Sequence, residues 1–291
     1  MILGQLLSEV FSQSEIKHIS DEWLNSRVSL TEVEDIDSFL AECEFESKSL
    51  KVAGPHRLQD WEEGWSGAGI ADDCIGFPNI PYYFKKNKYV RIGGSVYKDL
   101  SGLTELILLR CIQDVALSYV RGVDASAIIE YGCGTGHNLE YFDRRVQGLN
   151  IYAADWAESA IDHVVKMGIA SNSRAFRVDY FDPTSYQAPK EPFVACTVAS
   201  LEQTGENYAP FMSFLSENRL CRAVFHIEPI RDLILPDSRL NEFSISYSER
   251  RGYLKDFYHY VKSSNIRILV AKDFGLGSKF LSGYQLLIWS R

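Results

Sequence analysis

The sequence predicts an α/β fold in which a mostly parallel sheet carries helices on both faces. Seven candidate strands alternate with helical stretches from residue 127 to the C-terminus, which is the pattern of consecutive strand–helix units. The strand candidates are short apolar runs without polar alternation, as expected for parallel strands that are buried on both faces. A glycine-rich turn joins the first of these strands to the helix that follows it.

The glycine turn follows the candidate strand Ala127–Tyr131 and is preceded by an acid, Glu130. Its glycines are Gly132, Gly134 and Gly136. Such a turn lets a ligand lie against the backbone, and the next helix points its free N–H groups at that ligand. A dinucleotide fingerprint needs G-x-G-x-x-G, but His137 holds the place of its third glycine. The alternative is a strand-to-helix turn that binds nothing, because glycine-rich turns are common.

The second candidate strand, Asn150–Asp155, ends on an acid that lies about twenty residues beyond the glycine turn. Doubly wound folds place there the carboxylate that accepts hydrogen bonds from ribose hydroxyls. Asp155 could instead cap the next helix, which begins at once with Trp156. Trp156 in turn could pack beside an adenine ring or belong to the core or its rim.

The run of Glu130 and three alternating glycines resembles the first motif of class I S-adenosylmethionine-dependent methyltransferases. The resemblance covers Ala127 to Arg291, about 165 residues. It implies S-adenosyl-L-methionine as cofactor and a Rossmann-like sheet of seven strands in the order 3-2-1-4-5-7-6, with the last strand antiparallel. It also implies that Asp179, at the end of the third strand, accepts the adenine amino group, with Tyr180 beside it. Alternatively, Asp179 forms a turn before Asp182-Pro183.

The carboxyl ends of the fourth and fifth strands are expected to face the acceptor, because doubly wound folds bind ligands at that edge. The candidates there are Glu202, which follows the fourth strand, and His226 and Glu228 on the fifth. An oxygen acceptor gains from a base, for which His226 and Glu202 are the first candidates. The alternative for His226 is a buried histidine that backbone groups satisfy. Thr197–Ser200 is unlike the run that amino-methylating enzymes carry there, which disfavours methylation of DNA bases.

Residues 1–95 differ in character and form a predicted mainly helical N-terminal region that acts as a lid or recognises the acceptor. Residues 96–291 form the predicted cofactor-binding methyltransferase domain, with Gly93-Gly94 as a hinge or boundary. A helix from Leu103 to Tyr119 should lead into the first strand. Three aromatic residues could cover the pocket from the N-terminal side, although ordinary packing is an alternative for them: Trp65, Tyr82 and Tyr83. Arg91 could pair with the methionine carboxylate of the cofactor.

The composition disfavours several classes of binding partner. The chain has 291 residues and a net charge of −9, which opposes a general affinity for nucleic acid or anionic membranes. Its six cysteines form no CxxC pair, and no histidine cluster has zinc-ligand spacing, so no metal is expected. Reduced thiols, no visible signal peptide and no long apolar window favour a cytoplasmic protein. The oligomeric state stays open.

These observations predict methyl transfer from S-adenosylmethionine to a small-molecule or sugar-type acceptor. Two alternatives remain. One is a nicotinamide-dependent Rossmann oxidoreductase, against which the residue at position 137 argues. The other is a non-catalytic protein that keeps the cofactor pocket as a sensor or an interaction module.

Overall fold

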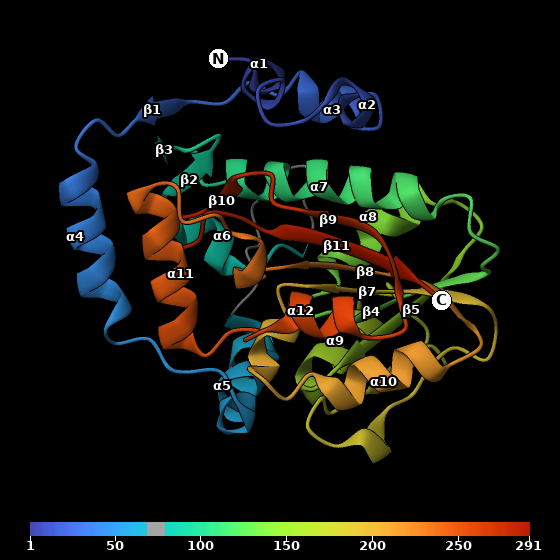
Figure 1. Ribbon diagram of the computed structural model, residues 1–291. Helices are drawn as coiled ribbons and strands as arrows, with labels where there is room; N and C mark the ends of the chain where they lie inside the picture. The colour runs from blue at the N-terminus through green and yellow to red at the C-terminus, as the bar shows by residue number, and fades with distance from the viewer. Residues whose placement is uncertain (69–78) are drawn as a thin grey trace.

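The computed structural model describes residues 1–68 and 79–291 and is built around a seven-stranded sheet (Figure 1). The strands of this sheet are β6 (Ala175–Arg177), β5 (Asn150–Asp155), β4 (Ala127–Tyr131), β7 (Phe193–Val198), β8 (Cys221–Glu228), β11 (Gln285–Ser290) and β9 (Arg267–Lys272), given in spatial order. β11 runs antiparallel to both neighbours, and the pairs among β4 to β8 are parallel. In chain order this is 3-2-1-4-5-7-6, so the predicted sheet is confirmed.

The central strand β4 shows why these segments lack polar alternation. All five of its residues are buried. Ile128 packs into one hydrophobic cluster, while Ile129 and Tyr131 pack into a second cluster on the opposite face. A strand whose two faces are both covered needs apolar side chains at successive positions, and that is the pattern seen in the sequence.

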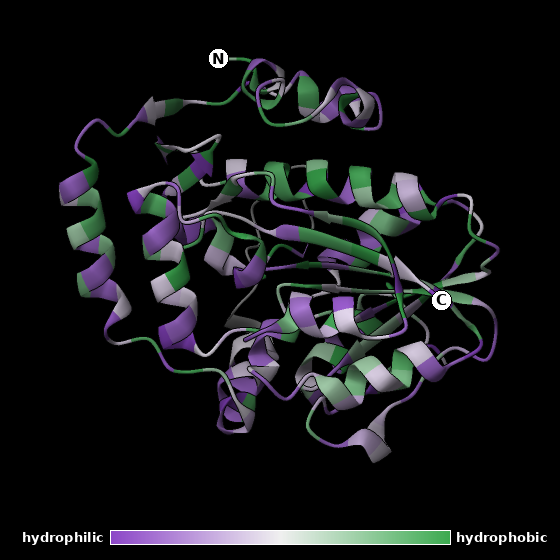
Figure 2. Ribbon diagram, viewed as in Figure 1, coloured by the Kyte–Doolittle hydropathy of each residue, from purple (hydrophilic) through white to green (hydrophobic). Residues whose placement is uncertain are grey.

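Helices cover both faces of the sheet. The first cluster takes side chains from α7 (Thr104–Val120), α8 (His137–Arg145) and α9 (Glu158–Lys166). The second takes them from α10 (Ala209–Glu217) and α12 (Phe257–Ser263). Helix α7 is apolar over most of its surface (Figure 2). It is buried almost throughout because the sheet lies on one side of it and the N-terminal helices lie on the other (Figure 1).

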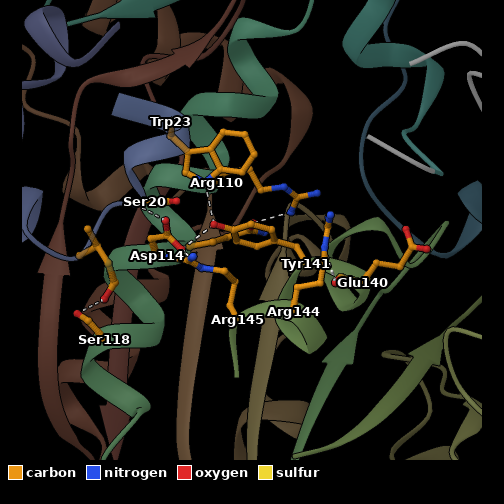
Figure 3. A network of polar contacts seen from close by, with 11 residues as sticks. Ser20, Trp23, Arg110, Asp114, Ser118, Glu140, Tyr141, Arg144 and Arg145 are labelled. Atoms are coloured by element: carbon orange, nitrogen blue, oxygen red, sulfur yellow. Dashed lines mark hydrogen bonds and ion pairs between the residues drawn. The ribbon is translucent and has the colours of Figure 1, made fainter. Parts of the chain in front are cut away.

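The N-terminal helices are α1 (Leu3–Leu7), α2 (Gln13–Ile16) and α3 (Asp21–Leu24), and a buried polar network ties α3 to α7 and α8 (Figure 3). Asp114 is its centre: one oxygen accepts from the Tyr141 hydroxyl at 2.6 Å and from Arg145 Nε at 2.9 Å. The other accepts from the Ser20 N–H at 2.9 Å. The Trp23 indole N–H donates to the Tyr141 oxygen at 2.9 Å. These helices therefore share one core with the large sheet.

A second, four-stranded antiparallel sheet joins the two ends of the chain. Its strands, in spatial order, are β1 (Leu30–Glu32), β3 (Ser95–Asp99), β2 (Tyr89–Ile92) and β10 (Leu276–Ser278). Gly93 and Gly94 turn the β2–β3 hairpin, with φ of +59° and +88°, values that suit glycine in a two-residue hairpin turn. The predicted boundary after residue 95 thus falls inside a hairpin whose two strands both belong to the small sheet.

Helices α4 (Ile36–Ser47) and α11 (Arg239–Arg251) pack beside this small sheet. Arg91 of β2 is buried there and donates to the Leu240 and Lys279 carbonyls and to the Ser244 hydroxyl. The guanidinium is thus engaged by the small sheet and α11, and the expected pairing of Arg91 with a cofactor carboxylate is wrong. The remaining elements are α5 (Leu58–Glu63), α6 (Tyr82–Lys86), η1 (Pro55–Arg57), η2 (Gly64–Ala68), η3 (Pro183–Ser185), η4 (Leu201–Thr204) and η5 (Arg231–Leu233).

Within residues 1–68 and 79–291, no helix combines the length and apolarity that crossing a lipid bilayer requires. The cysteines in the same ranges are buried, unpaired thiols: Cys43, Cys111, Cys133, Cys196 and Cys221. The sixth, Cys74, lies outside the described residues.

Candidate functional site

A cavity of about 1330 Å³ opens at the glycine turn. Its walls come from the turn itself, the segment after β7, the end of α11, α5 with η2, and the edge of the small sheet around Tyr89 and Ser278. A second cavity of about 60 Å³ shares Gly132, Trp61 and Trp65 with the first. Both lie where β4 and β7 end, which is the edge at which open parallel sheets bind ligands.

The three glycines of the turn all have positive φ, and Gly134 is the one that faces the cavity beneath an aromatic ring. Their φ values are +76° at Gly132, +51° at Gly134 and +74° at Gly136. A Cβ built on Gly134 would lie 3.1 Å from the Trp65 ring. A side chain there would enter the space in which a ligand could approach the backbone.

The other two glycines allow close packing of neighbouring elements. A Cβ on Gly132 would lie 2.3 Å from Ser200 Cβ, so the absence of a side chain lets the segment after β7 approach the turn. A Cβ on Gly136 would lie 2.8 Å from Val164 of α9. The turn is therefore shaped for contact with the next parts of the fold as well as for a ligand.

Asp155, at the end of β5, is buried and holds the glycine turn in place. Its two carboxylate oxygens accept backbone hydrogen bonds of 2.8 Å each, from the Gly134 N–H and the Ala157 N–H. Burial raises its pKa to about 6, although these donors act in the opposite direction. Each carboxylate oxygen can accept a further hydrogen bond, and Asp155 lines the smaller cavity. Its ribose role stays a prediction.

Two of the three residues expected beside adenine line the smaller cavity. Trp156 and Tyr180 line the smaller cavity, and the Tyr180 hydroxyl lies 3.4 Å from Ser200 Oγ. The Asp179 carboxylate instead accepts from the Phe181 N–H at 2.8 Å. This bond closes a turn before Asp182-Pro183, as in the alternative expectation for Asp179. Its contact with adenine stays a prediction.

Glu130 is fully buried behind the turn and reaches the cavity only through Asn138. Its Oε1 accepts from Asn138 Nδ2 at 2.7 Å, and Asn138 lines the cavity. Burial raises the pKa of Glu130 to about 8, against the Asn138 hydrogen bond and the charge of Arg110. Arg110 also donates to Asn138 Oδ1 at 3.0 Å. Glu130 therefore orients Asn138, a residue that no sequence motif marked.

On the acceptor side, Glu202 lines the larger cavity and Glu228 supports it. Glu202 Oε1 accepts from Gln203 at 3.0 Å. The Glu228 oxygens accept from the Ser200 and Leu201 N–H groups at 3.0–3.1 Å, which fixes the η4 turn that carries Glu202. Burial and the neighbouring Glu202 charge raise the pKa of Glu228 well above its usual range.

His226 does not face the acceptor, and that prediction is wrong. Its side chain is fully buried, and burial lowers its pKa to about 3. The Trp289 indole donates to Nε2 at 3.0 Å, and Nδ1 lies 2.8 Å from the Thr197 hydroxyl. Since Nε2 accepts, the ring proton is on Nδ1 and points to Thr197. Both nitrogens are engaged, so this histidine holds the core together.

Two tryptophans from the N-terminal region cover the glycine turn. The Trp61 and Trp65 rings stack with centroids 5.7 Å apart, and both line both cavities. Glu62 between them accepts from the Glu158 and Ser159 N–H groups at 2.6 and 3.0 Å, which anchors α5 to the start of α9. Tyr83 also lines the larger cavity, whereas the Tyr82 side chain is 54% exposed.

The larger cavity collects buried polar atoms that have no hydrogen-bond partner among the described residues. These atoms are Trp61 Nε1, His137 Nε2, Glu202 Oε2, Gln203 Oε1 and Arg251 Nε. Buried polar groups are normally satisfied, so their convergence suits a polar ligand. In the part of the chain that the structure describes, no cluster of His, Cys, Asp or Glu could hold a metal ion.

The chain matches no protein-family model and no curated protein. Among solved structures, it is similar to the plantazolicin methyltransferase BpumL in complex with SAH, at 17% identity and a TM-score of 0.37, over 57% of this chain and 75% of that one. It is also similar to magnesium protoporphyrin IX methyltransferase from Synechocystis PCC 6803 with bound SAH, at 13% identity and a TM-score of 0.42, over 60% and 78% of the two chains.

A third similar structure is an O-methyltransferase family protein from Burkholderia thailandensis, at 15% identity and a TM-score of 0.42, over 64% of this chain and 58% of that one. Identities and scores this low say nothing about substrates. The fold follows from the sheet itself, whose seven strands stand in the order 3-2-1-4-5-7-6 with a single antiparallel strand. By this strand order the chain has the class I methyltransferase fold.

Proposed function

We propose that the protein binds S-adenosyl-L-methionine and transfers its methyl group to a small-molecule acceptor. The observation that carries the proposal is the glycine turn between β4 and α8, which forms one wall of a large cavity at the ligand-binding edge of the sheet. Unpartnered buried polar atoms line the same cavity. A strand-to-helix turn that bound nothing would give no reason for these atoms to remain unsatisfied.

The residues present fit such a cofactor. Gly134 lines the larger cavity without a side chain, beneath the Trp65 ring. Asp155 lines the smaller cavity, where its carboxylate could accept ribose hydroxyls in addition to its backbone donors. Asn138, held by Glu130 and Arg110, presents its amide at the other end of the turn. When bound, the cofactor supplies a methyl group that its positive sulfonium already activates. The protein then has to align the acceptor and exclude water.

Glu202 is the group that we assign to the acceptor proton. Glu202 lines the cavity, and its Oε2 would accept the proton that the acceptor oxygen or nitrogen gives up on methylation. Glu228 positions the turn that carries Glu202. Burial and the neighbouring Glu202 charge raise the pKa of Glu228 well above its usual range, which favours a proton on Glu228.

The N-terminal region has the role of a cover in this proposal. Trp61 and Trp65 lie over the glycine turn, and Glu62 fixes their helix to α9. Stacked indole rings at this place would shield the transferring methyl group from water. The region would thus act as the lid that the sequence led us to expect. Unlike a separate domain, however, it is joined to the rest of the fold through the small sheet.

The first test is calorimetric titration with S-adenosylmethionine, S-adenosylhomocysteine and NADH. We expect saturable one-to-one binding of the first two and none of NADH. No heat and no thermal shift at millimolar S-adenosylhomocysteine would refute the proposal, and binding of NADH alone would favour an oxidoreductase. Turnover of a library of small hydroxyl and amine acceptors then separates an enzyme from a non-catalytic module.

A pair of glycine variants tests whether the turn is the binding surface. Gly134→Val should abolish binding of S-adenosylhomocysteine while circular dichroism stays unchanged. Gly168→Val is the matched control: Gly168 also has positive φ, +70°, but nothing lies within 4 Å of its Cβ position. Both variants carry similar backbone strain, so only a loss confined to Gly134→Val supports the assignment. Unchanged affinity in that variant would remove the turn from the site.

A further inference from the structure

Arg251, the last residue of α11, is a buried cation in the wall of the larger cavity. Its side chain is only 8% exposed, and its Nε has no hydrogen-bond partner among the described residues. The other buried arginines, Arg91 and Arg110, donate to carbonyl and amide oxygens. Arg251 forms no ion pair with any carboxylate in residues 1–68 or 79–291. Arg91 and Arg110 likewise form no ion pair among the described residues, and Arg91 Nε is also unpartnered, but of these three arginines only Arg251 lies in the cavity wall. An oxyanion in the cavity would supply the opposite charge that this buried cation lacks.

The guanidinium of Arg251 is held in place by aromatic rings. Its central carbon lies 5.1 Å from the Tyr253 ring centroid and 6.0 Å from that of Tyr247, and both tyrosines line the cavity. The Arg251 carbonyl accepts from the Ala53 N–H at 2.8 Å, which fixes the end of α11. The guanidinium also hydrogen-bonds to the Tyr253 side chain, and its unpartnered Nε–H stays available for a planar oxyanion.

The charges around the cavity favour an anion, although the whole chain carries a net charge of −9. The cations in its wall are Lys48, Lys86, Lys88, Arg251 and Lys279, and the acids are Glu46, Glu105 and Glu202. Lys279 pairs with Glu46 at 2.8 Å and also with Glu42, so it adds no free positive charge. The remaining four cations stand against two acids, Glu105 and Glu202. The balance in the wall is therefore positive, opposite in sign to that of the chain.

We propose that the acceptor bound in this cavity is a planar molecule that carries a carboxylate or a phosphate, and that Arg251 binds this oxyanion. The aromatic walls, which include Tyr83, Tyr253 and Phe280, suit the planar part. The inference rests on the proposed function in one respect, namely that the ligand is called the methyl acceptor. The oxyanion site itself rests on Arg251 and the charge of the wall.

One competing assignment is that Arg251 binds the methionine carboxylate of the cofactor. The site lies on α11 and the segment after it, which follow β8, whereas the glycine turn follows β4. The two assignments differ in what an Arg251 variant loses. A variant of an acceptor-binding residue keeps its affinity for S-adenosylhomocysteine, and a variant of a cofactor-binding residue loses it.

The test is calorimetric titration of the full chain with benzoate, phenyl phosphate and the neutral benzamide, each with and without saturating S-adenosylhomocysteine. We expect at least one of the two anions to bind at least about tenfold more tightly than benzamide. Tighter binding of benzoate would indicate a carboxylate site, and tighter binding of phenyl phosphate would indicate a phosphate site. Arg251→Gln should weaken that anion about tenfold to a hundredfold, the range expected for charge-assisted hydrogen bonds. It should leave benzamide and S-adenosylhomocysteine unchanged.

Arg250→Gln is the matched control, because Arg250 is the neighbouring arginine of the same helix and pairs with Glu44 at the surface. Arg251→Lys keeps the charge and should retain part of the anion affinity if Arg251→Gln fails to fold. Equal binding of benzamide and both anions, or full anion affinity in Arg251→Gln, overturns the inference, as does a loss of S-adenosylhomocysteine affinity in that variant. Failure of wild type to bind S-adenosylhomocysteine would refute the proposed function alone, since the anion titrations without it still decide on the oxyanion site.

Discussion

Replacing Asp155 with asparagine should make the stability difference from wild type depend on pH. In the folded protein, burial raises the pKa of Asp155 from 3.8 to about 6. A carboxyl whose pKa is raised by folding contributes stability that is fully present below the unfolded pKa and is lost as pH rises through the folded pKa. A shift of about two units corresponds to a total of about 3 kcal/mol. Part of this loss has already occurred at pH 4.5, which leaves roughly 2 kcal/mol between about pH 4.5 and pH 7.5.

The amide of Asp155→Asn has nearly the same shape and does not titrate. The free energy of unfolding of the variant, relative to wild type, should therefore rise by roughly 2 kcal/mol from about pH 4.5 to pH 7.5. Urea unfolding followed by circular dichroism at both pH values measures it. Titrations of carboxyls remote from Asp155 occur in both proteins and cancel in the difference. Glu130 is not among them, because the Asp155 charge contributes to its raised pKa.

Asp182→Asn is the control. Asp182 is exposed, and hydrogen bonds from Thr184 lower its pKa, so this variant should show no relative gain as pH rises. A constant difference between wild type and Asp155→Asn would show that burial does not raise the Asp155 pKa, and a relative loss at high pH would reverse its sign. Asp155→Asn should also weaken S-adenosylhomocysteine about tenfold, because the ribose contact would lose its charge.

Other substitutions give three further expectations. Gly132→Ala should unfold the protein or cost several kcal/mol, because its Cβ would lie 2.3 Å from Ser200 Cβ; Gly168→Ala, which meets open space, should cost only about 1 kcal/mol of backbone strain, and equal melting temperatures would contradict this. His226→Ala should lower stability by about 2–4 kcal/mol in urea unfolding, through a cavity and an orphaned indole N–H, while S-adenosylhomocysteine affinity stays unchanged; an affinity loss without a stability loss would return His226 to the site. Glu130→Gln should gain stability relative to wild type as pH rises from about 4.5 to about 8, since the folded pKa of Glu130 is about 8, and a flat difference in the same unfolding assay would contradict it.

The large sheet was predictable because each strand carries its own signal. The run Asn150–Asp155 is short, apolar and bounded by turn residues, and the structure gives β5 the same bounds. The strand expected from Ala127 onward is β4. The small sheet was not predictable. β1 and β10 have three residues each, and β10 pairs with β2, with Leu276 opposite Ile92. Pairing between segments so distant in sequence leaves no local pattern.

The candidate site was predictable at the glycine turn and less so on the acceptor side. His226 and Glu228 lie two residues apart on β8 and point to the same face of the sheet. Glu228 ends the strand and reaches the η4 turn, whereas His226 lies about 7 Å further inside, beneath Trp289. Whether a side chain of β8 reaches the cavity thus depends on how far it lies from the carboxyl end of the strand. That position is set by neighbouring strands, whose placement the sequence does not show. Trp61 was missed because the segment around it carries no motif that shows which surface it will cover.

The small sheet sets a limit on how this protein could be re-engineered. In many two-part enzymes, a recognition module can be exchanged for that of a relative. Here the cavity wall includes Tyr89 of β2 and Ser278 of β10, and these two strands pair with each other although they lie far apart in the chain. A chimera that replaced only the first hundred or so residues would keep half of this wall and lose the strand that aligns it. New acceptor specificity would therefore require the N-terminal strands of the small sheet and β10 to be exchanged together.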